Sequence, residues 1–361
     1  MRTLDFNTIE KFYIAALTKA GVPIEDSKII ADVLLEADKL GIDSHGLNRL
    51  KPIYLDRIKE GIVNPVTKVE IVRESPTTAV IDGNNGMGHV VGKRAMEMCI
   101  QKAKTYGMGM VAVRNSSHYG IAGYYGLMAS KAGMIGITGT NARPSIAPTF
   151  GVENMLGTNP LTFVMPTDED FPFFLDCATS VSQRGKFECY AKEGKDLPQG
   201  WVIDREGNSK TNSIEVLEDL VKGNAALTPV GGIGEDTAGY KGYGYATVVE
   251  ILSSALQGGN FLRALLGFEN GKKIPYRLGH FFIAINIENF IDLDKFKKTT
   301  GKILRELRSS KKMPNQTRIY TAGEKEYDNF IERQKNGVPI NDSLWEELKI
   351  IAKEYNITIN G

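Results

Sequence analysis

The sequence lacks long apolar runs and carries no large excess of charge of either sign. Its 361 residues include 44 Lys and Arg and 43 Asp and Glu, which leaves a net charge of +1. A nucleic-acid-binding protein needs a basic surplus on one face, and a helix that crosses a bilayer needs about 20 predominantly apolar residues in a row. We therefore expect no nucleic-acid partner and no membrane span. A small anion remains an acceptable ligand, because one or two cations suffice to bind it.

Cysteine is also scarce. Cys99, Cys177 and Cys189 are odd in number and form no Cys-x-x-Cys pair, so free thiols in a reducing compartment are expected. The first residues, MRTLDFNTIEKF, lack the apolar core of a signal peptide. These features predict a cytoplasmic protein, with a soluble organelle matrix as the alternative.

The motifs of several enzyme classes are absent. No cluster of His, Cys and carboxylate residues has the spacing of metal ligands, so no metal is expected. No Gly-x-Ser-x-Gly supports a serine hydrolase. Although there are 38 glycines, no segment spells Gly-x-Gly-x-x-Gly. Gly86 and Gly88 with Gly92 form a looser version, but the following strand ends in Arg114 where a ribose-binding acid is usual. This pattern favours a tight turn over a dinucleotide loop.

The ends of the chain differ from its middle. Residues 7–61 have helical periodicity, with a second helix expected to begin after Asp43 or Ser44, and charged helical sequence returns from Asp292. The middle alternates short β-branched runs with helices. Strands are expected at 77–83, 107–115, 133–141, 159–167, 171–180 and 281–287, and helices at 92–106, 123–132, 213–221 and 245–256. The pattern predicts an α+β protein with a helical domain of residues 1–75 plus about 290–361 and a mixed domain of about 76–290.

Four histidines are candidates for proton transfer: His45, His89, His118 and His280. His118 follows the expected strand 107–115, at the type of position where catalytic groups are often found, and imidazole titrates near neutrality. A loop histidine hydrogen-bonded to its polar neighbours is the alternative.

His45 lies in the segment DSHGLNR, residues 43–49. If a helix begins at Ser44, His45 and Arg49 share one face of it, and a guanidinium can hold a carboxylate through two parallel hydrogen bonds. The alternative is a capped surface helix with both side chains in solvent. A second glycine-rich stretch, 231–246, has Lys241 ahead of a helix. It could approach an anion through its backbone, or be a flexible surface loop.

Taken together, several segments resemble the type-2 malate/L-lactate dehydrogenase family, which includes ureidoglycolate, sulfolactate and diketogulonate oxidoreductases. The resemblance covers nearly the whole chain. Its segments are DSHGLNRL (43–50), RNSSHYGIAGYY (114–125), GTNPLTFVMPT (157–167), LDCATS (175–180), GYKGYGYATVVEILSSAL (239–256) and AGE (322–324).

The resemblance implies a non-Rossmann fold, in which a mixed-sheet domain binds NAD or NADP and a helical domain is built from both chain ends, in a homodimer. It also implies hydride transfer between the cofactor and a small 2-hydroxy acid, with malate or L-lactate favoured. Ureidoglycolate or sulfolactate is the alternative within the family. A non-catalytic metabolite-binding relative is the alternative of another class.

The resemblance further assigns roles to residues. His118 is the expected proton shuttle, and His45 is its rival. Substrate contacts are expected from Ser44, Arg49, Tyr54, Asn141 and Arg143, and cofactor contacts from His45, Asp176, Ala178, Thr179, Lys241, Gly242, Gly323 and Glu324. Arg143 follows the strand at 133–141, in a stretch where some relatives carry a lysine. Either Arg143 takes the place of that lysine, or the substrate differs from that of those relatives.

Overall fold

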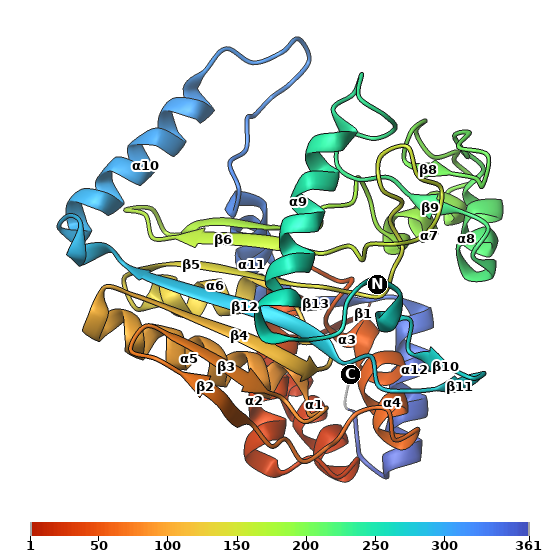
Figure 1. Cartoon of the computed structure of the whole chain (residues 1–361), viewed down its shortest axis with the longest axis horizontal. Coiled ribbons are helices and arrows are strands. Elements are labelled where there is room, and N and C mark those ends of the chain that lie inside the picture. Colours follow the sequence, from red (N-terminus) through yellow and green to blue (C-terminus); the bar gives the residue numbers. More distant parts are fainter. Residues whose placement is uncertain (1, 360–361) are drawn as a thin grey trace.

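The two ends of the chain pack together in the computed structural model, which describes residues 2–359. Strand β1 (Arg2–Leu4) pairs antiparallel with β13 (Val338–Ile340). Helices α1 (Phe6–Lys19), α2 (Ile24–Lys39) and α12 (Asp342–Tyr355) share a core in which Ile9, Leu34 and Leu348 are fully buried. Figure 1 shows the red N-terminal helices beside the blue C-terminal ones. The helices expected at both ends are confirmed, whereas the domain boundaries near residues 75 and 290 stay a prediction.

A seven-stranded mixed sheet forms the centre of the molecule. Its order is β2-β3-β4-β12-β5-β6-β7, and among these strands only β3 and β4 pair in parallel. All six expected strands are confirmed. The seventh, β2, was not expected, because its five residues are all exposed and show no apolar face. The bounds are β2 (Glu70–Glu74), β3 (Thr78–Asp82), β4 (Met108–Ser116), β5 (Met134–Thr140), β6 (Leu161–Met165), β7 (Phe173–Cys177) and β12 (Leu278–Asn286).

Helices cover both faces of this sheet (Figure 1). On one face, α5 (Gly88–Tyr106) and α6 (Gly123–Lys131) pack against the strands around the buried side chains of Val91, Cys99 and Phe282. On the other face lies α9 (Gly239–Leu252). The single parallel step, β3-α5-β4, sits in an otherwise antiparallel sheet, so the expected mixed, non-Rossmann architecture is confirmed.

Residues 184–227 form a small lobe with its own core. Helices α7 (Arg184–Lys192) and α8 (Ser213–Lys222) and the strands β8 (Val202–Ile203) and β9 (Ala226–Leu227) surround the buried side chains of Phe187 and Val216. The expected helix at 213–221 is confirmed as α8. Helix α7 and the strands β8 and β9 were not among the elements expected from the sequence.

Two expected helix starts are wrong. Helix α5 begins at Gly88 instead of Gly92, and α9 begins at Gly239 instead of residue 245, so Lys241 lies in the first turn of α9 and not ahead of it. Glycine weakens intrinsic helix propensity, which made both starts look like loops, and tertiary packing overrides that preference.

The remaining elements connect these parts. Helix α10 (Leu293–Ser309) confirms the charged helix expected from Asp292 and extends away from the rest of the chain (Figure 1), and α11 (Glu324–Asn336) returns to the terminal helices. Short segments complete the order: α3 (Leu47–Arg49), the π-helical turn Leu50–Leu55, α4 (Asp56–Lys59), the 3-10 turns Ala255–Gln257, Leu262–Leu265 and Ile287–Asn289, and the hairpin β10 (Phe268–Glu269) with β11 (Lys272–Lys273). Within residues 2–359, no helix is both long and apolar enough to cross a membrane.

Candidate active site

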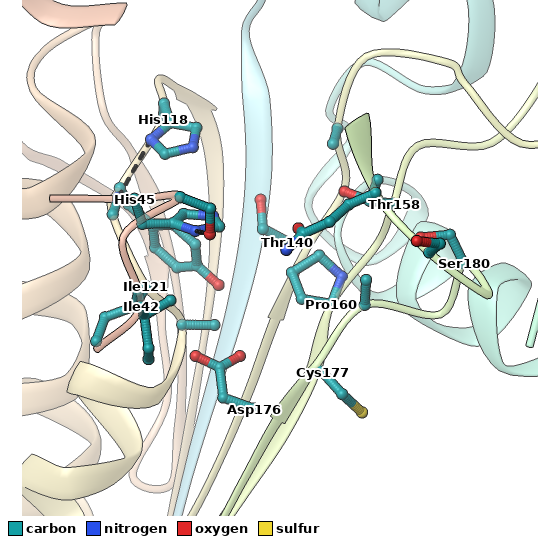
Figure 2. Close-up of a pocket in the computed structure, with 18 of the residues that line it drawn as sticks. Ile42, His45, His118, Ile121, Thr140, Thr158, Pro160, Asp176, Cys177 and Ser180 are labelled. Atoms are coloured by element: carbon teal, nitrogen blue, oxygen red, sulfur yellow. Dashed lines mark hydrogen bonds between the residues drawn. The ribbon is translucent and has the colours of Figure 1, made fainter. Parts of the chain in front are cut away.

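A cavity of about 550 Å³ lies at one edge of the sheet, against the turn that follows α2. Strands β4, β5 and β7 run in the same direction and end at this edge, where β6 and β12 begin. Side chains far apart in the sequence therefore meet there. His118 follows β4 and Ser180 follows β7 (Figure 2). Asn141, which also lines the cavity, follows β5.

Two histidines stand at one end of the cavity. The rings of His45 and His118 are stacked, with centroids 5.8 Å apart and an interplanar angle of 23°. Burial and, to a smaller extent, the positive charge of Arg49 lower the pKa of His45 to about 4. Burial also holds the pKa of His118 well below its ordinary value, with His45 the next contributor. Both imidazoles are therefore neutral at neutral pH in the free protein.

The loop that carries His118 is fixed by the start of α5. The N–H of Gly88 donates to Ser117 Oγ at 3.0 Å, and that hydroxyl donates to the carbonyl of Gly86 at 2.8 Å. A Cβ on Gly88 would lie 2.2 Å from the Ser117 carbonyl oxygen, so only glycine allows the helix to come this close. The Gly86–Gly88 turn thus positions the segment of His118, a role that the sequence motif did not indicate.

The segment with His45 differs from the expected helix. Helix α3 begins at Leu47, and its first N–H is capped by Asp38 Oδ1 at 3.1 Å, so the predicted N-cap at Asp43 or Ser44 is wrong. Asp43 instead accepts two hydrogen bonds from Arg333, at 2.6 and 2.9 Å. A Cβ on Gly46 would lie 1.8 Å from Asp38 Oδ1, which explains why the turn passes through a glycine.

Arg49 lies beside the two histidines. Its Nε donates to the Ser44 carbonyl at 2.5 Å, and its charge lowers the pKa of both His45 and His118. The hydroxyl of Ser44 is 2.7 Å from His45 Nδ1. Of this group, Ser44, His45 and His118 line the cavity, and Arg49 stands next to them.

The other expected substrate contacts are placed differently. Tyr54 is buried behind His118, with its hydroxyl 2.7 Å from His118 Nδ1. Asn141 lines the cavity, but its amide is engaged by Gly279 N–H at 2.9 Å and by the Asn260 carbonyl at 3.1 Å. Arg143 is exposed and is not among the side chains that line the cavity.

The expected cofactor contacts fall into two groups. Asp176 and Ala178 line the cavity. Asp176 accepts hydrogen bonds from Gly123 N–H at 2.7 Å and from Thr162 at 2.9 Å, while burial raises its pKa. Thr179 braces the wall, donating to the carbonyls of Thr158 and Asn159.

The other expected cofactor contacts, at the start of α9 and before α11, are not among the residues that line the cavity. Lys241 is exposed on the first turn of α9, next to the buried Gly242. Gly323 precedes α11, where the buried carboxylate of Glu324 accepts from Arg318 and from Thr321 N–H. Glu326, two residues further on, does line the cavity.

Two polar groups that the sequence patterns did not predict lie at the far end of the cavity. Ser180 and Ser182 line it, both are more than nine-tenths buried, and neither hydroxyl has a hydrogen-bond partner among the described residues. Lys186 lines the same end, in the first turn of α7. The S-x-S pattern directly after LDCAT was the available signal. Within residues 2–359, no three His, Cys, Asp or Glu side chains are grouped to hold a metal ion.

Comparison with known proteins places this geometry in context. A family model described as malate/L-lactate dehydrogenase matches residues 4–349. The malate dehydrogenase of Pyrococcus horikoshii is 48% identical over 346 residues, which cover 96% of this chain and 93% of the relative. The L-sulfolactate dehydrogenase of Methanocaldococcus jannaschii is 40% identical, covering 97% of this chain and 96% of the relative. The crystal structure of malate dehydrogenase from Entamoeba histolytica superposes with a TM-score of 0.96 at 47% identity, covering 100% and 99% of the two chains.

Asp38 makes the stability of the folded protein depend on pH in a testable way. Besides capping Leu47, Asp38 accepts a hydrogen bond from the hydroxyl of Tyr13 at 2.5 Å. Burial raises the pKa of its carboxyl to about 7. The unfolded carboxyl has a pKa of about 3.9. The stabilising contribution of the protonated form is therefore fully present below about pH 4 and is lost as the pH rises through 7.

Asparagine cannot ionise, so Asp38→Asn should become more stable relative to the wild type by up to about 4 kcal/mol between pH 4 and pH 8. Urea unfolding of both proteins at several pH values measures this difference, with Asp294→Asn, an exposed carboxyl on α10, as the control. Parallel curves for Asp38→Asn and wild type would contradict the prediction.

Proposed function

The chain belongs to the malate/L-lactate dehydrogenase family and is an oxidoreductase that acts on the CH–OH group of 2-hydroxy acids, and we propose that it transfers a hydride between malate and NAD. The observation that carries the proposal is the pair of neutral, stacked histidines beside Arg49 at one end of the cavity. At the other end, the buried hydroxyls of Ser180 and Ser182 have no hydrogen-bond partner within residues 2–359. The first end fits a carboxylate substrate, and the second fits the phosphates of a dinucleotide.

Charge supports a dianionic substrate. The guanidinium groups of Arg49 and Arg57 both lower the pKa of His118, and Arg143 in turn lowers the pKa of Arg57. A substrate with two negative groups offsets more of this positive charge than one carboxylate does. Malate fits this better than L-lactate or ureidoglycolate, which carry one carboxylate each. Sulfolactate, a carboxylate and sulfonate dianion, is the second candidate, and a relative of that name is 40% identical.

The residues of the cavity fit a nicotinamide dinucleotide. Ser180 and Ser182 have hydroxyls free to donate, and the N-terminal end of α7, with Lys186 in its first turn, favours phosphate. Two carboxyls, Asp176 and Glu326, line the cavity as well. A carboxylate accepts hydrogen bonds from a ribose diol and repels a 2′-phosphate, so we propose NAD and keep NADP as the alternative.

In this proposal each protein group has one task. When bound, the nicotinamide ring accepts or supplies the hydride. His118 exchanges the hydroxyl proton of the substrate through Nε2, because its Nδ1 is engaged by Tyr54. Arg49 holds a carboxylate through its two terminal nitrogens, since its Nε is bound to the Ser44 carbonyl. His45 is the second candidate for the proton shuttle.

We also propose that the protein is a cytoplasmic homodimer. Its three cysteines are free thiols, as expected in a reducing compartment. Large apolar side chains are exposed on α9 and α10, among them Tyr245, Ile251, Ile303 and Leu307, and a second copy would cover them. Light scattering would give twice the chain mass of 39.7 kDa for a dimer, and a monomer at all concentrations would contradict it.

A panel of 2-oxo acids tests the activity. We expect oxaloacetate to be reduced with a higher kcat/KM than pyruvate, and NADH to be preferred over NADPH, in a spectrophotometric assay of cofactor oxidation. Sulfopyruvate in the same panel tests the second candidate, because it is the 2-oxo acid that corresponds to sulfolactate. No turnover with any acid and no NADH binding by calorimetry would reject the proposed function.

Replacement of His118 distinguishes an enzyme from a non-catalytic relative. His118→Ala should lower kcat by about 10²- to 10⁴-fold, the usual contribution of general acid–base catalysis. Binding of NADH, measured by calorimetry, should stay near the wild-type value. If turnover were unchanged, the proton shuttle would lie elsewhere, and His45→Ala would be the next variant to assay.

Replacement of Arg49 tests the carboxylate anchor. Lysine keeps the charge but cannot form two parallel hydrogen bonds, so Arg49→Lys should raise KM for the 2-oxo acid about 10- to 100-fold. Arg94→Lys, on the surface of α5, is the matched control. Unchanged kcat and KM in Arg49→Lys would show that the substrate carboxylate binds elsewhere.

A further inference from the structure

Tyr54 is held rigidly behind His118. It lies in the π-helical turn, is 2% exposed, and is not among the residues that line the cavity. Its ring packs edge-on against His89, with centroids 4.6 Å apart at 62°. On its other side, the hydroxyl is 2.7 Å from His118 Nδ1. The hydroxyl is therefore fixed at one nitrogen of the expected proton shuttle and has no direct access to a ligand.

A second group defines the protonation state of that nitrogen in the free protein. The backbone N–H of Gly120 donates to His118 Nδ1 at 3.3 Å, the contact dashed in Figure 2. An N–H can only donate, so Nδ1 is an acceptor in this state. The neutral imidazole then carries its proton on Nε2, and the Tyr54 hydroxyl also donates to Nδ1.

Catalysis requires the opposite arrangement at Nδ1. To take the substrate's proton, Nε2 must offer its lone pair, so the neutral ring must carry its proton on Nδ1. After the transfer, the cationic ring carries protons on both nitrogens. In both states Nδ1 donates, and Gly120 N–H cannot accept. The same N–H also interacts with the Tyr54 hydroxyl, whose oxygen can accept it when Nδ1 is protonated.

The charged and polar neighbours of His118 make protonation of its ring still less favourable. The groups that act on His118 are His45 from the turn after α2, Arg49 and Arg57 from the α3–α4 segment, and His89 from α5, and all four disfavour a protonated ring. Tyr54 itself stays protonated, because burial raises the pKa of its phenol far above neutrality. A phenol can both donate and accept, so its oxygen suits both forms of Nδ1.

We propose that Tyr54 is a positioning residue that reverses its hydrogen bond to His118 Nδ1, donating in the free protein and accepting when substrate is bound, so that Nε2 is available for proton transfer. In this change Nε2 releases its proton to water and Nδ1 takes one proton from water, so the imidazole stays neutral and the phenol keeps its own proton. The inference rests on the proposed function, in which His118 is the shuttle. In the oxidation, the C2–H bond breaks and its electron pair leaves with the hydride to the nicotinamide. The hydroxyl proton moves to Nε2, the C2–O bond becomes a carbonyl, and the proton on Nδ1 stays in place with Tyr54 as its acceptor.

The reversal is visible by NMR of protein labelled with ¹⁵N in its four histidines, with His118→Gln to assign the signals. In the free wild type we expect an unprotonated Nδ1 and a protonated Nε2 in His118. With NADH and oxalate, a non-reducible two-carbon dicarboxylate, we expect Nδ1 to become protonated. An Nδ1 that is already protonated in the free protein, or that stays unprotonated in the complex, would overturn the proposal.

Tyr54→Phe removes only the hydroxyl and keeps the ring against His89. We expect kcat to fall about 10- to 100-fold, the loss of one hydrogen bond to a charged group, with KM changed less than twofold. The kinetic pKa in the pH profile should fall by about one pH unit, because the protonated ring loses its acceptor. Tyr124→Phe, which removes a hydroxyl bound to Asp32 at 2.5 Å, is the matched control.

Different results would contradict the proposed function and the positioning role of Tyr54. If NADH fluorescence showed no binding with oxalate present, the proposed function would fail before Tyr54 is tested. If the complex formed, but Tyr54→Phe retained the wild-type kcat and pH profile, Tyr54 would have no positioning role. If Tyr54→Phe did not fold, the wild-type spectra alone would still decide the matter, because they report the protonation of Nδ1 directly.

Discussion

The site depends on the partial burial of two neutral imidazoles beside two guanidinium groups. His45 and His118 are each partly buried in the wall of the cavity, which lowers their pKa values, and Arg49 and Arg57 stand close enough to disfavour protonation of His118. Removing a charge from water is costly, and a neighbouring like charge adds to that cost. In the free protein the histidines therefore remain neutral beside the positive charges of the two guanidinium groups. An anionic substrate adds negative charge beside the imidazoles, so binding of substrate and protonation of the shuttle favour each other.

The terminal helices hold these groups in place. Asp38, at the end of α2, joins Tyr13 of α1 to the first N–H of α3, and Arg333 of α11 binds Asp43 in the same turn. The turn with His45 is thus braced by segments from both ends of the chain. A change in the packing of the terminal helices would reach the histidines through these buried polar contacts, which connects the stability of the helical part directly to the geometry of the site.

The sheet brings the other wall of the cavity together. Because β4, β5 and β7 end at the same edge, their following loops supply His118, Asn141 and Ser180 to one space. The βαβ unit contributes differently from a Rossmann unit. The Gly86–Gly88 turn presses on the backbone of Ser117 and so fixes the histidine loop. Glycine serves close packing here, while the groups suited to phosphate lie after β7.

Local pattern by itself was enough to identify six of the seven strands of the central sheet, the helical ends, and His118 at the end of a strand, because periodicity and turn residues act over a few neighbours. The resemblance of ordered segments added the family and the pairing of His118 with His45 and Arg49. Only the tertiary structure decided that α3 begins at Leu47, that Lys241 lies on a helix, and that Tyr54 stands behind His118. Each of these depends on contact with a distant residue, such as the 64 positions between Tyr54 and His118. Packing between such segments overrides local propensity and leaves no local signal in the sequence.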